Sequence, residues 1–243
     1  ASQTQILTLT NSGAGATAFR LLEQDDGGLA LMKPGVDAPL SLITSGGPDT
    51  FGYTYKDSTE SGGPIYDWVD ISATGTPVYL YDDDGDGPFS IGFVFNFYGN
   101  DHTNLYVSSN GYLSFNDSYL TYLSNDCPLP SVYDPNDSIY LMWDDLYPGY
   151  YGDPVYYQAF TDCPYDGGQA CLVMQYENFH HYGASEVAGT FEAILFENGS
   201  ILIQFEDAGD EEGSGSTTGI ENEDGTIGLT YACNTEGSLN DNL

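Results

Sequence analysis

Acidic residues at alternate positions of one short segment could bind a hard metal ion. The segment runs Tyr81-Asp-Asp-Asp-Gly-Asp-Gly87, and Asp82, Asp84 and Asp86 have the D-x-D-x-D-G spacing of a calcium loop. Carboxylates with this spacing can converge on one cation, and Gly87 allows the sharp turn that this requires. The sequence therefore predicts Ca²⁺ as a cofactor, with Asp82, Asp84 and Asp86 as its ligands.

One ligand of the usual calcium loop is missing. A bidentate Glu is expected at the twelfth loop position, where this chain has Phe93. A calcium site would therefore recruit a ligand from elsewhere, or bind in the weak extracellular range of about 10⁻⁴–10⁻³ M. A solvated acidic turn is the alternative interpretation.

Two further pairs of residues could do chemistry. Asp144 and Asp145 follow Trp143 at the end of an expected strand. Neighbouring strand residues point to opposite faces, so we expect structural hydrogen bonds or a second cation site there rather than a glycosidase pair. The adjacent His180 and His181 could ligate a metal, but neither an HExxH motif nor a third ligand histidine accompanies them.

Enzyme motifs are absent from the sequence. We find no G-x-S-x-G, no P-loop and no dinucleotide fingerprint. The acidic run from Glu206 to Glu212 lies among Gly and Ser residues and is expected to be a solvated face. We therefore predict that the protein is not an enzyme.

The charge balance excludes one class of partner. The 243 residues contain 37 Asp and Glu but only 3 Lys and Arg, which gives a formal net charge of −34. Nucleic acid is excluded as a partner because phosphate binding needs basic side chains. No stretch approaches the roughly 18 apolar residues of a membrane span. The 21 Tyr and 12 Phe indicate a folded acidic protein rather than a disordered one.

Four cysteines predict two disulfides. Cys163 and Cys171 flank a turn-like segment, so a local bridge is natural, and Cys127 is left to pair with Cys233. Free thiols or a metal site are the alternatives, although neither gap has C-x-x-C spacing. Disulfides imply an oxidising, extracellular or cell-surface location. The polar start Ala1-Ser-Gln-Thr4 suits an N-terminus from which a signal peptide has been cleaved.

The elements that position these residues are expected to be strands. Phe89 to Tyr98 alternates apolar and polar residues and predicts a strand with one buried face. Asn110-Gly111, Asn198-Gly199 and Asp224-Gly225 each separate two strand-like runs and fit type I′ hairpin turns. We predict an all-β fold, an antiparallel β-sandwich with hairpin meanders. Further strands are expected near residues 65–71, 76–81, 138–144, 154–160 and 171–177.

The N-terminal segment has a different pattern. Gln5 to Thr10 and Ala16 to Glu23 read as a β-hairpin, with Leu7 and Leu9 on one apolar face and Phe19 and Leu21 on the other strand. A lone hairpin is marginal in water, so these faces must dock on something. The Gly- and Pro-rich stretch that follows predicts an extended linker. The expected organisation is a hairpin over 1–24, a linker over 25–57 and the sandwich over 58–243.

Several blocks of sequence resemble one known extracellular domain. They are Phe93-Val-Phe-Asn-Phe-Tyr-Gly99, Leu105-Tyr-Val-Ser-Ser-Asn-Gly-Tyr-Leu-Ser-Phe115, Leu141-Met-Trp-Asp-Asp-Leu146, Val155-Tyr-Tyr-Gln158, and Thr190 to Phe205. In this order they resemble the nidogen-like (NIDO-type) domain, which also occurs in secreted bacterial multidomain proteins. The resemblance implies adhesion or matrix roles without catalysis. Separately, Leu7-Thr-Leu-Thr-Asn-Ser-Gly13 resembles a strand and turn of a bacterial immunoglobulin-like module.

Three functions are compatible with these features. The favoured one is an extracellular structural subunit that assembles with itself into a head-to-tail filament by donating its N-terminal strands to a neighbouring copy. The alternative is an adhesin or carbohydrate-binding module that contacts surface glycans through tyrosines such as Tyr147, Tyr150 and Tyr151. An acidic-site hydrolase is the weakest of the three. Sequons at Asn116, Asn136 and Asn198 would allow a glycoprotein.

Overall fold

The computed structural model describes residues 20–23, 29–32 and 45–243, except 149–151. Within these ranges every regular element is a strand. The chain divides into two compact units, Ala1–Leu42 and Ile43–Leu243. In the first unit, β1 (Arg20–Glu23) pairs antiparallel with β2 (Leu29–Met32). The sequence predicts a linker for Leu29–Met32, which the structure shows as a strand, and the predicted strand from Gln5 to Thr10 lies outside the described residues.

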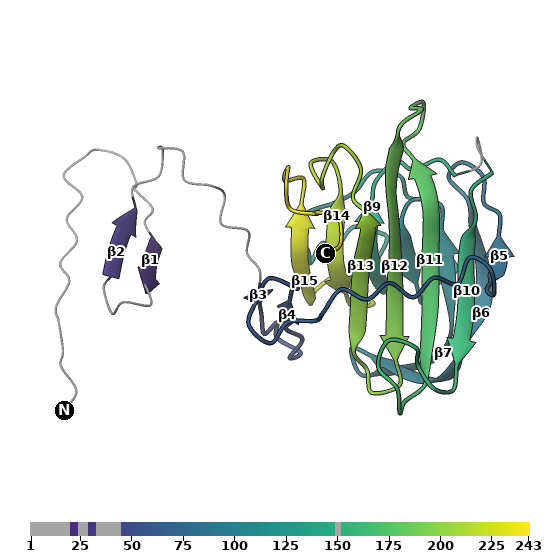
Figure 1. Cartoon of the computed structure of the whole chain (residues 1–243), viewed down its shortest axis with the longest axis horizontal. Coiled ribbons are helices and arrows are strands. Elements are labelled where there is room, and N and C mark those ends of the chain that lie inside the picture. The colour runs from purple at the N-terminus through teal and green to yellow at the C-terminus, as the bar shows by residue number, and fades with distance from the viewer. Residues whose placement is uncertain (1–19, 24–28, 33–44, 149–151) are drawn as a thin grey trace. The chain divides into compact units, whose positions relative to one another are not determined.

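The second unit contains two large antiparallel sheets (Figure 1). The six-stranded sheet has the order β15-β14-β9-β8-β7-β6. Its strands are β6 (Gly85–Phe97), β7 (Asn100–Ser108), β8 (Tyr112–Ser114), β9 (Ser138–Trp143), β14 (Thr217–Glu221) and β15 (Gly228–Cys233). A separate short ribbon pairs β3 (Ser45–Gly46) with β4 (Tyr55–Lys56). The described residues 45–57 belong to the same compact unit as the sandwich.

The five-stranded sheet has the order β13-β12-β11-β10-β5. Its strands are β5 (Thr76–Val78), β10 (Val155–Phe160), β11 (Cys171–His180), β12 (Val187–Phe196) and β13 (Ile201–Asp207). In this order β13 and β5 are the edge strands. The antiparallel β-sandwich predicted from the sequence is confirmed.

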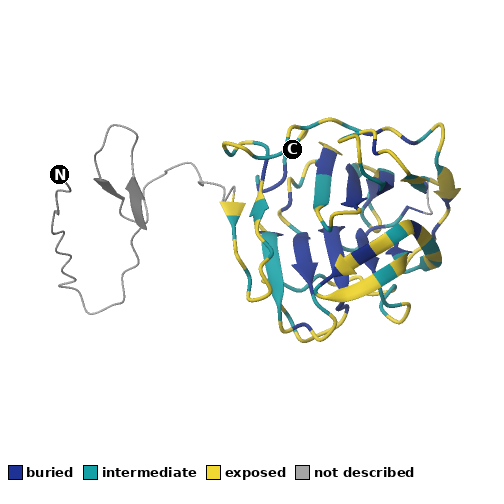
Figure 2. Ribbon diagram, turned by 90° about the horizontal axis from the view of Figure 1, so that it is seen from below, coloured by how far each residue is buried: buried dark blue, intermediate teal, exposed yellow. Residues whose placement is uncertain are grey.

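The main core lies between the two sheets, as the burial colours in Figure 2 show. In β6 the burial alternates as the sequence predicts, because successive side chains of a strand point to opposite faces. Ile91, Phe95 and Phe97 are fully buried, whereas Val94 on the opposite face is 55% exposed. The opposed strands contribute Leu172, Met174, Tyr176, Phe191 and Leu195 to the same core.

Residues 65–71, which the sequence predicted as a strand, form instead an extended strap across the outer face of the five-stranded sheet (Figure 1). The strap crosses the strands, so it cannot join their ladder. Its alternate backbone N–H groups donate to side chains of the sheet. Asp67 N donates to Gln204 Oε1 (2.9 Å), Val69 N to Glu192 Oε1 (3.1 Å), and Ile71 N to Gln175 Oε1 (2.8 Å).

The strap also gives the sheet a second core. Val69 and Ile71 pack there with Val173, Ile194 and the Cys163–Cys171 disulfide. The second bridge, Cys127–Cys233, spans 106 residues and has a Cα–Cα distance of 5.6 Å. Both predicted disulfides are therefore confirmed.

The three glycine turns differ from the predicted type. Gly111, Gly199 and Gly225 have φ of +77°, +89° and +61°, but the preceding Asn or Asp is not in the positive-φ region. A type I′ turn needs positive φ at both residues, so the prediction of type I′ turns is wrong. Gly199 N donates to Phe196 O and Gly225 N to Asn222 O, which places each glycine at the last position of its turn. In these turns only the glycine at the last position adopts the left-handed conformation, which glycine does at little cost.

Candidate binding groove and cation sites

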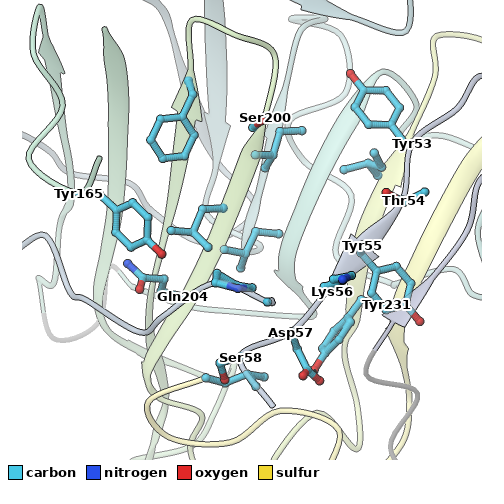
Figure 3. Close-up of a pocket in the computed structure, with 18 of the residues that line it drawn as sticks. Tyr53, Thr54, Tyr55, Lys56, Asp57, Ser58, Tyr165, Ser200, Gln204 and Tyr231 are labelled. Carbon is cyan, nitrogen blue, oxygen red and sulfur yellow. The ribbon is translucent and has the colours of Figure 1, made fainter. Parts of the chain in front are cut away.

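A groove of about 710 Å³ runs along β13, the edge strand of the five-stranded sheet. We call it the edge groove. Figure 3 shows it bounded on one side by β13 and on the other by the segment Tyr53–Ser58 and Tyr231 of β15. The side chains that line its floor are mainly apolar and include Ile201, Leu202, Ile203, Ile220 and Leu229.

The position of β13 at the edge of its sheet explains why its apolar side chains face this groove. Ile201 and Ile203 point toward the main core, and Leu202 packs against the second core on the other face. All three are only partly buried. A strand within the sheet would have neighbours on both sides, but β13 has a strand partner only in β12. Its apolar surface therefore stays partly exposed at the edge.

The outer backbone edge of β13 is paired at one end. Phe205 N donates to Leu243 O (3.2 Å), and Asn242 N donates to Phe205 O (2.8 Å), so the C-terminal residues occupy this position. Peptide groups of a strand alternate in direction, so Ile203 and Ile201 also point their N–H and C=O away from β12. No described residue outside β12 pairs with these two backbones. They can accept an added strand.

The opposite wall of the groove is held in place by polar contacts. The rings of Tyr55 and Tyr231 meet edge to face at 5.3 Å, and Tyr231 Oη donates to Asp57 Oδ2 (3.1 Å). Burial, reinforced by the nearby Asp57 carboxylate, raises the pKa of Tyr231. On the outer side, Tyr165 Oη donates to Ile65 O (2.7 Å). These contacts hold Tyr231 on one wall of the groove and Tyr165 on the other in place.

A cluster of carboxylates lies at one end of the sandwich. The ligand oxygens of Asp82, Asp83 and Asp145 lie within 4.8 Å of one another. Burial raises the pKa of Asp145, and the charges of Asp83 and Asp82 raise it further. Asn110 Nδ2 donates to Asp83 Oδ1 (3.0 Å) and holds this carboxylate in place. Such a group of oxygens is the type of ligand set that Ca²⁺ prefers.

The structure places the three predicted calcium ligands differently from one another. Asp82 belongs to the carboxylate cluster, but Asp84 and Asp86 do not. Asp84 accepts hydrogen bonds from the backbone N–H of Tyr81 (3.1 Å) and Gly85 (2.9 Å), and Asp86 accepts one from Gly87 (2.8 Å). These hydrogen bonds hold Asp84 and Asp86 within the loop, whereas Asp145 lies beside Asp82 from a distant part of the chain.

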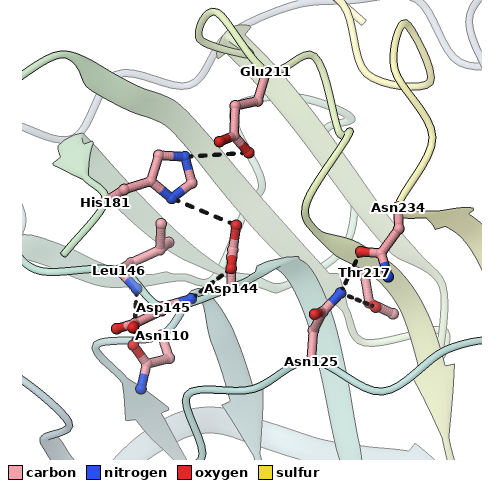
Figure 4. A network of polar contacts seen from close by, with 9 residues as sticks. All are labelled: Asn110, Asn125, Asp144, Asp145, Leu146, His181, Glu211, Thr217 and Asn234. Atoms are coloured by element: carbon pink, nitrogen blue, oxygen red, sulfur yellow. Dashed lines mark hydrogen bonds and ion pairs between the residues drawn. The ribbon is translucent and has the colours of Figure 1, made fainter. Parts of the chain in front are cut away.

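Asp144 and Asp145 lie in a bend after the end of β9 at Trp143, not in a strand, and they belong to different clusters. Asp145 joins the carboxylate cluster, whereas Asp144 lies beside His181 and Glu211. Figure 4 shows the His181 ring between the two carboxylates of this second group. Burial raises the pKa of Asp144. Sequence reasoning missed this group because Glu211 had been assigned to a solvated run, and no local spacing connects it to His181.

Two of the three sequons lie on accessible chain. Asn198 is exposed in the turn between β12 and β13, and Asn116 is half-buried. Asn136 is buried, with 5% of its surface exposed. In the folded protein, Asn136 is therefore inaccessible to a glycan.

The antiparallel sandwich with two disulfides is of a class typical of secreted and cell-surface modules. A family model described as NIDO related matches residues 53–242. The chain therefore belongs to the NIDO-related family, as the resemblance of its sequence blocks predicted. Family and disulfides together are consistent with an extracellular protein. No curated protein and no solved structure matches the chain at a significant level. Among the described residues, no helix is long and apolar enough to cross a membrane.

Proposed function

We propose that the chain is an extracellular structural subunit that assembles head to tail by adding its N-terminal strands to the edge groove of a neighbouring copy. The observation that carries the proposal is the groove itself, which combines apolar lining with two outward-facing backbones at Ile201 and Ile203. Strand addition uses both features, because main-chain hydrogen bonds give the direction and apolar pockets give the fit.

The sequence of the N-terminal segment suits the donor role. Gln5 to Thr10 alternates, with Leu7 and Leu9 on one face and Thr8 and Thr10 on the other. The edge groove presents matching apolar side chains on its floor. Full burial of four large side chains, Leu7, Leu9, Phe19 and Leu21, would stabilise docking by at most about 6–12 kcal/mol. Ordering the segment would offset much of this.

Such a contact joins different surfaces of the two copies. An interface of this kind does not close on itself, so it makes a fibre unless the rotation between copies forms a ring. The competing arrangement is that the N-terminal strands dock in the groove of their own chain. That arrangement uses the same residues but leaves the protein monomeric.

Paired variants of the full-length chain test the proposal. Leu7→Asp together with Leu9→Asp should abolish polymers, since two charges would enter an apolar groove. Thr8→Asp with Thr10→Asp adds the same charges to the other face and should leave assembly intact. Polymers are detected by negative-stain electron microscopy and by light scattering. Wild-type protein that stays monomeric at high concentration would contradict the proposal, as would equal loss in both double variants.

A variant of the edge groove, which accepts the donated strand, tests whether assembly runs head to tail. Ile203→Pro removes an outward N–H that β12 does not use, so the sheet should stay intact. Neither this variant nor the Leu7/Leu9 variant should polymerise alone. Mixed together, they should form dimers only, because one supplies a working donor and the other a working groove. Long polymers in the mixture, or none of the dimer, would refute head-to-tail strand addition. The melting temperature of each variant shows whether it is folded.

A second candidate function, an adhesin or carbohydrate-binding module, is favoured by a pair of tyrosines near the acidic end. The rings of Tyr147 and Tyr182 lie 5.8 Å apart, and Tyr182 is 61% exposed. Tyr182 N donates to Asp145 O (2.9 Å), which places this pair beside the carboxylate cluster. Tyr150 and Tyr151 lie outside the described residues. Binding to a glycan array that is lost in Tyr182→Ala would support this function.

Calcium binding is part of the proposal. Asp82 is retained as a ligand, and Asp83 and Asp145 complete the oxygen set, in place of the Asp84 and Asp86 expected from the loop spacing. We also propose that the protein is not an enzyme. The assignment of Asp144 and Asp145 to separate clusters supports this, because each carboxylate faces other partners.

A further inference from the structure

The second cluster at the end of the sandwich combines one imidazole with two carboxylates. Asp144 lies directly after β9, His181 directly after β11, and Glu211 in the loop between β13 and β14. One ligand atom from each lies within 4.8 Å of the others. The three residues are far apart in the sequence and meet only through the fold (Figure 4).

The distances in this cluster are long for hydrogen bonds. His181 Nδ1 lies 3.4 Å from Asp144 Oδ2, and His181 Nε2 lies 3.5 Å from Glu211 Oε2. An N–H···O hydrogen bond normally spans about 2.7–3.2 Å. Two ligands of a tetrahedral zinc ion, each with a bond of about 2.0–2.2 Å, are separated by about 3.3–3.6 Å. The separation of His181 Nε2 from Glu211 Oε2 therefore fits two ligands around one ion better than partners in a direct bond.

Two further observations point to a ligand between these side chains. His181 Nε2 is buried and has no hydrogen-bond partner. Gly215 leaves room beside the carboxylates, because a Cβ at this position would lie 2.8 Å from Glu211 Oε2 and 3.0 Å from Asp144 Oδ2. A buried polar atom without a partner is costly, and an ion would satisfy it.

We propose that Asp144, His181 and Glu211 bind one divalent transition-metal ion of the zinc type, with water completing its coordination. The ion takes Nε2, which has no hydrogen-bond partner, together with one carboxylate oxygen from each of Glu211 and Asp144. An imidazole ligand favours zinc, whereas the neighbouring Asp82, Asp83 and Asp145 offer only the oxygens that calcium prefers. The ion would fasten the β13–β14 loop to the ends of β9 and β11. This site is independent of strand donation.

Zinc titration of the full-length chain tests the site. The titration is followed by calorimetry in excess calcium, so that the acidic surface and the carboxylate cluster are already occupied. Wild-type protein should bind one Zn²⁺ per chain. Loss of a residue next to a metal ligand typically weakens binding by about 10–100-fold, so His181→Gln, which removes a ligand, should weaken it at least about 10-fold. Co²⁺ in place of Zn²⁺ should give a visible absorption band that is lost in the same variant.

His180→Gln is the matched control. His180 is adjacent in the sequence, but its Nδ1 faces Asp153 Oδ2 at 3.7 Å instead of the cluster. Zinc affinity should be unchanged in this variant. The absence of a zinc site in wild-type protein, affinity unaffected by His181→Gln, or equal losses in both variants would each overturn the proposal. Glu211→Gln should weaken zinc and leave the metal-free melting temperature unchanged, which separates loss of a ligand from loss of the fold.

Discussion

Glu192 gives the sharpest test of how the strap is held on the sheet. It lies on β12 beneath residues 65–71 and is fully buried. Its Oε1 accepts hydrogen bonds from Val69 N (3.1 Å) and Gln204 Nε2 (2.7 Å), whereas its Oε2 is buried without a hydrogen-bond partner. Burial raises the pKa of Glu192 to about 8, and the charges of Glu206 and Asp70 contribute in the same direction.

The sign of the pH dependence follows from this shift. The pKa of Glu192 in the unfolded chain is the ordinary 4.5, below the folded value of about 8. The contribution of Glu192 to stability is therefore full below about pH 4.5 and is lost as the pH rises toward 8. Each pH unit in that window removes about 1.4 kcal/mol, so at pH 7 the loss is of the order of 3 kcal/mol.

Glu192→Gln keeps the shape and the Oε1 acceptor but cannot ionise. Relative to wild type, it should change the free energy of unfolding little at about pH 4.5 and raise it by roughly 3 kcal/mol near pH 7. Chemical denaturation at constant high salt measures the difference. Glu197→Gln removes a charge from an exposed position after the same strand and should show no such rise. A Glu192→Gln difference that stays flat between about pH 5 and about pH 8 would refute the reasoning.

Three other predictions concern ions and covalent links. Chelation of calcium should lower the melting temperature, and Asp145→Asn should abolish the chelator effect while Asp86→Asn leaves it; an unchanged melting curve on adding chelator would count against a calcium site. Replacing Cys127 and Cys233 by Ser should destabilise the fold by about 2 kcal/mol more than replacing Cys163 and Cys171, because the bridges span 106 and 8 residues; denaturant titration decides this, and equal losses would contradict it. Assembly should increase with salt, because salt screens the repulsion between chains that each carry a charge of −34; the Debye length falls from about 8 Å at 0.15 M to about 3 Å at 1 M. Light scattering that falls with added salt would show that charge repulsion does not limit assembly.

Local sequence patterns were enough to predict the fold class, the main buried face and the disulfides. Period-two alternation in β6 predicted which of its residues are buried, because a strand has only two faces. The pairing of Cys163 with Cys171 followed from their closeness in the chain, and the other bridge followed by elimination. Each of these inferences depends on residues that are neighbours in the sequence or on a simple count.

Predictions from local sequence patterns were less reliable where the same residues are compatible with two backbone conformations. The strap has the alternation of a strand, yet its N–H groups bind the side chains of Gln204, Glu192 and Gln175. An extended segment can run along a sheet or across it, and only its neighbours decide which. The Asn-Gly turns show the same limit, since both type I′ and other turns use a glycine with positive φ.

Contacts between side chains that are far apart in the sequence could not be predicted without the fold. Glu211 is 30 residues from His181 in the sequence, and Asp145 is 63 residues from Asp82, but strand order brings each pair together at one end of the sandwich. The edge groove likewise depends on β13 being the last strand of its sheet. Strand order depends on how the whole core packs. The contacts that it creates join residues far apart in the chain, so no local spacing in the sequence predicts them.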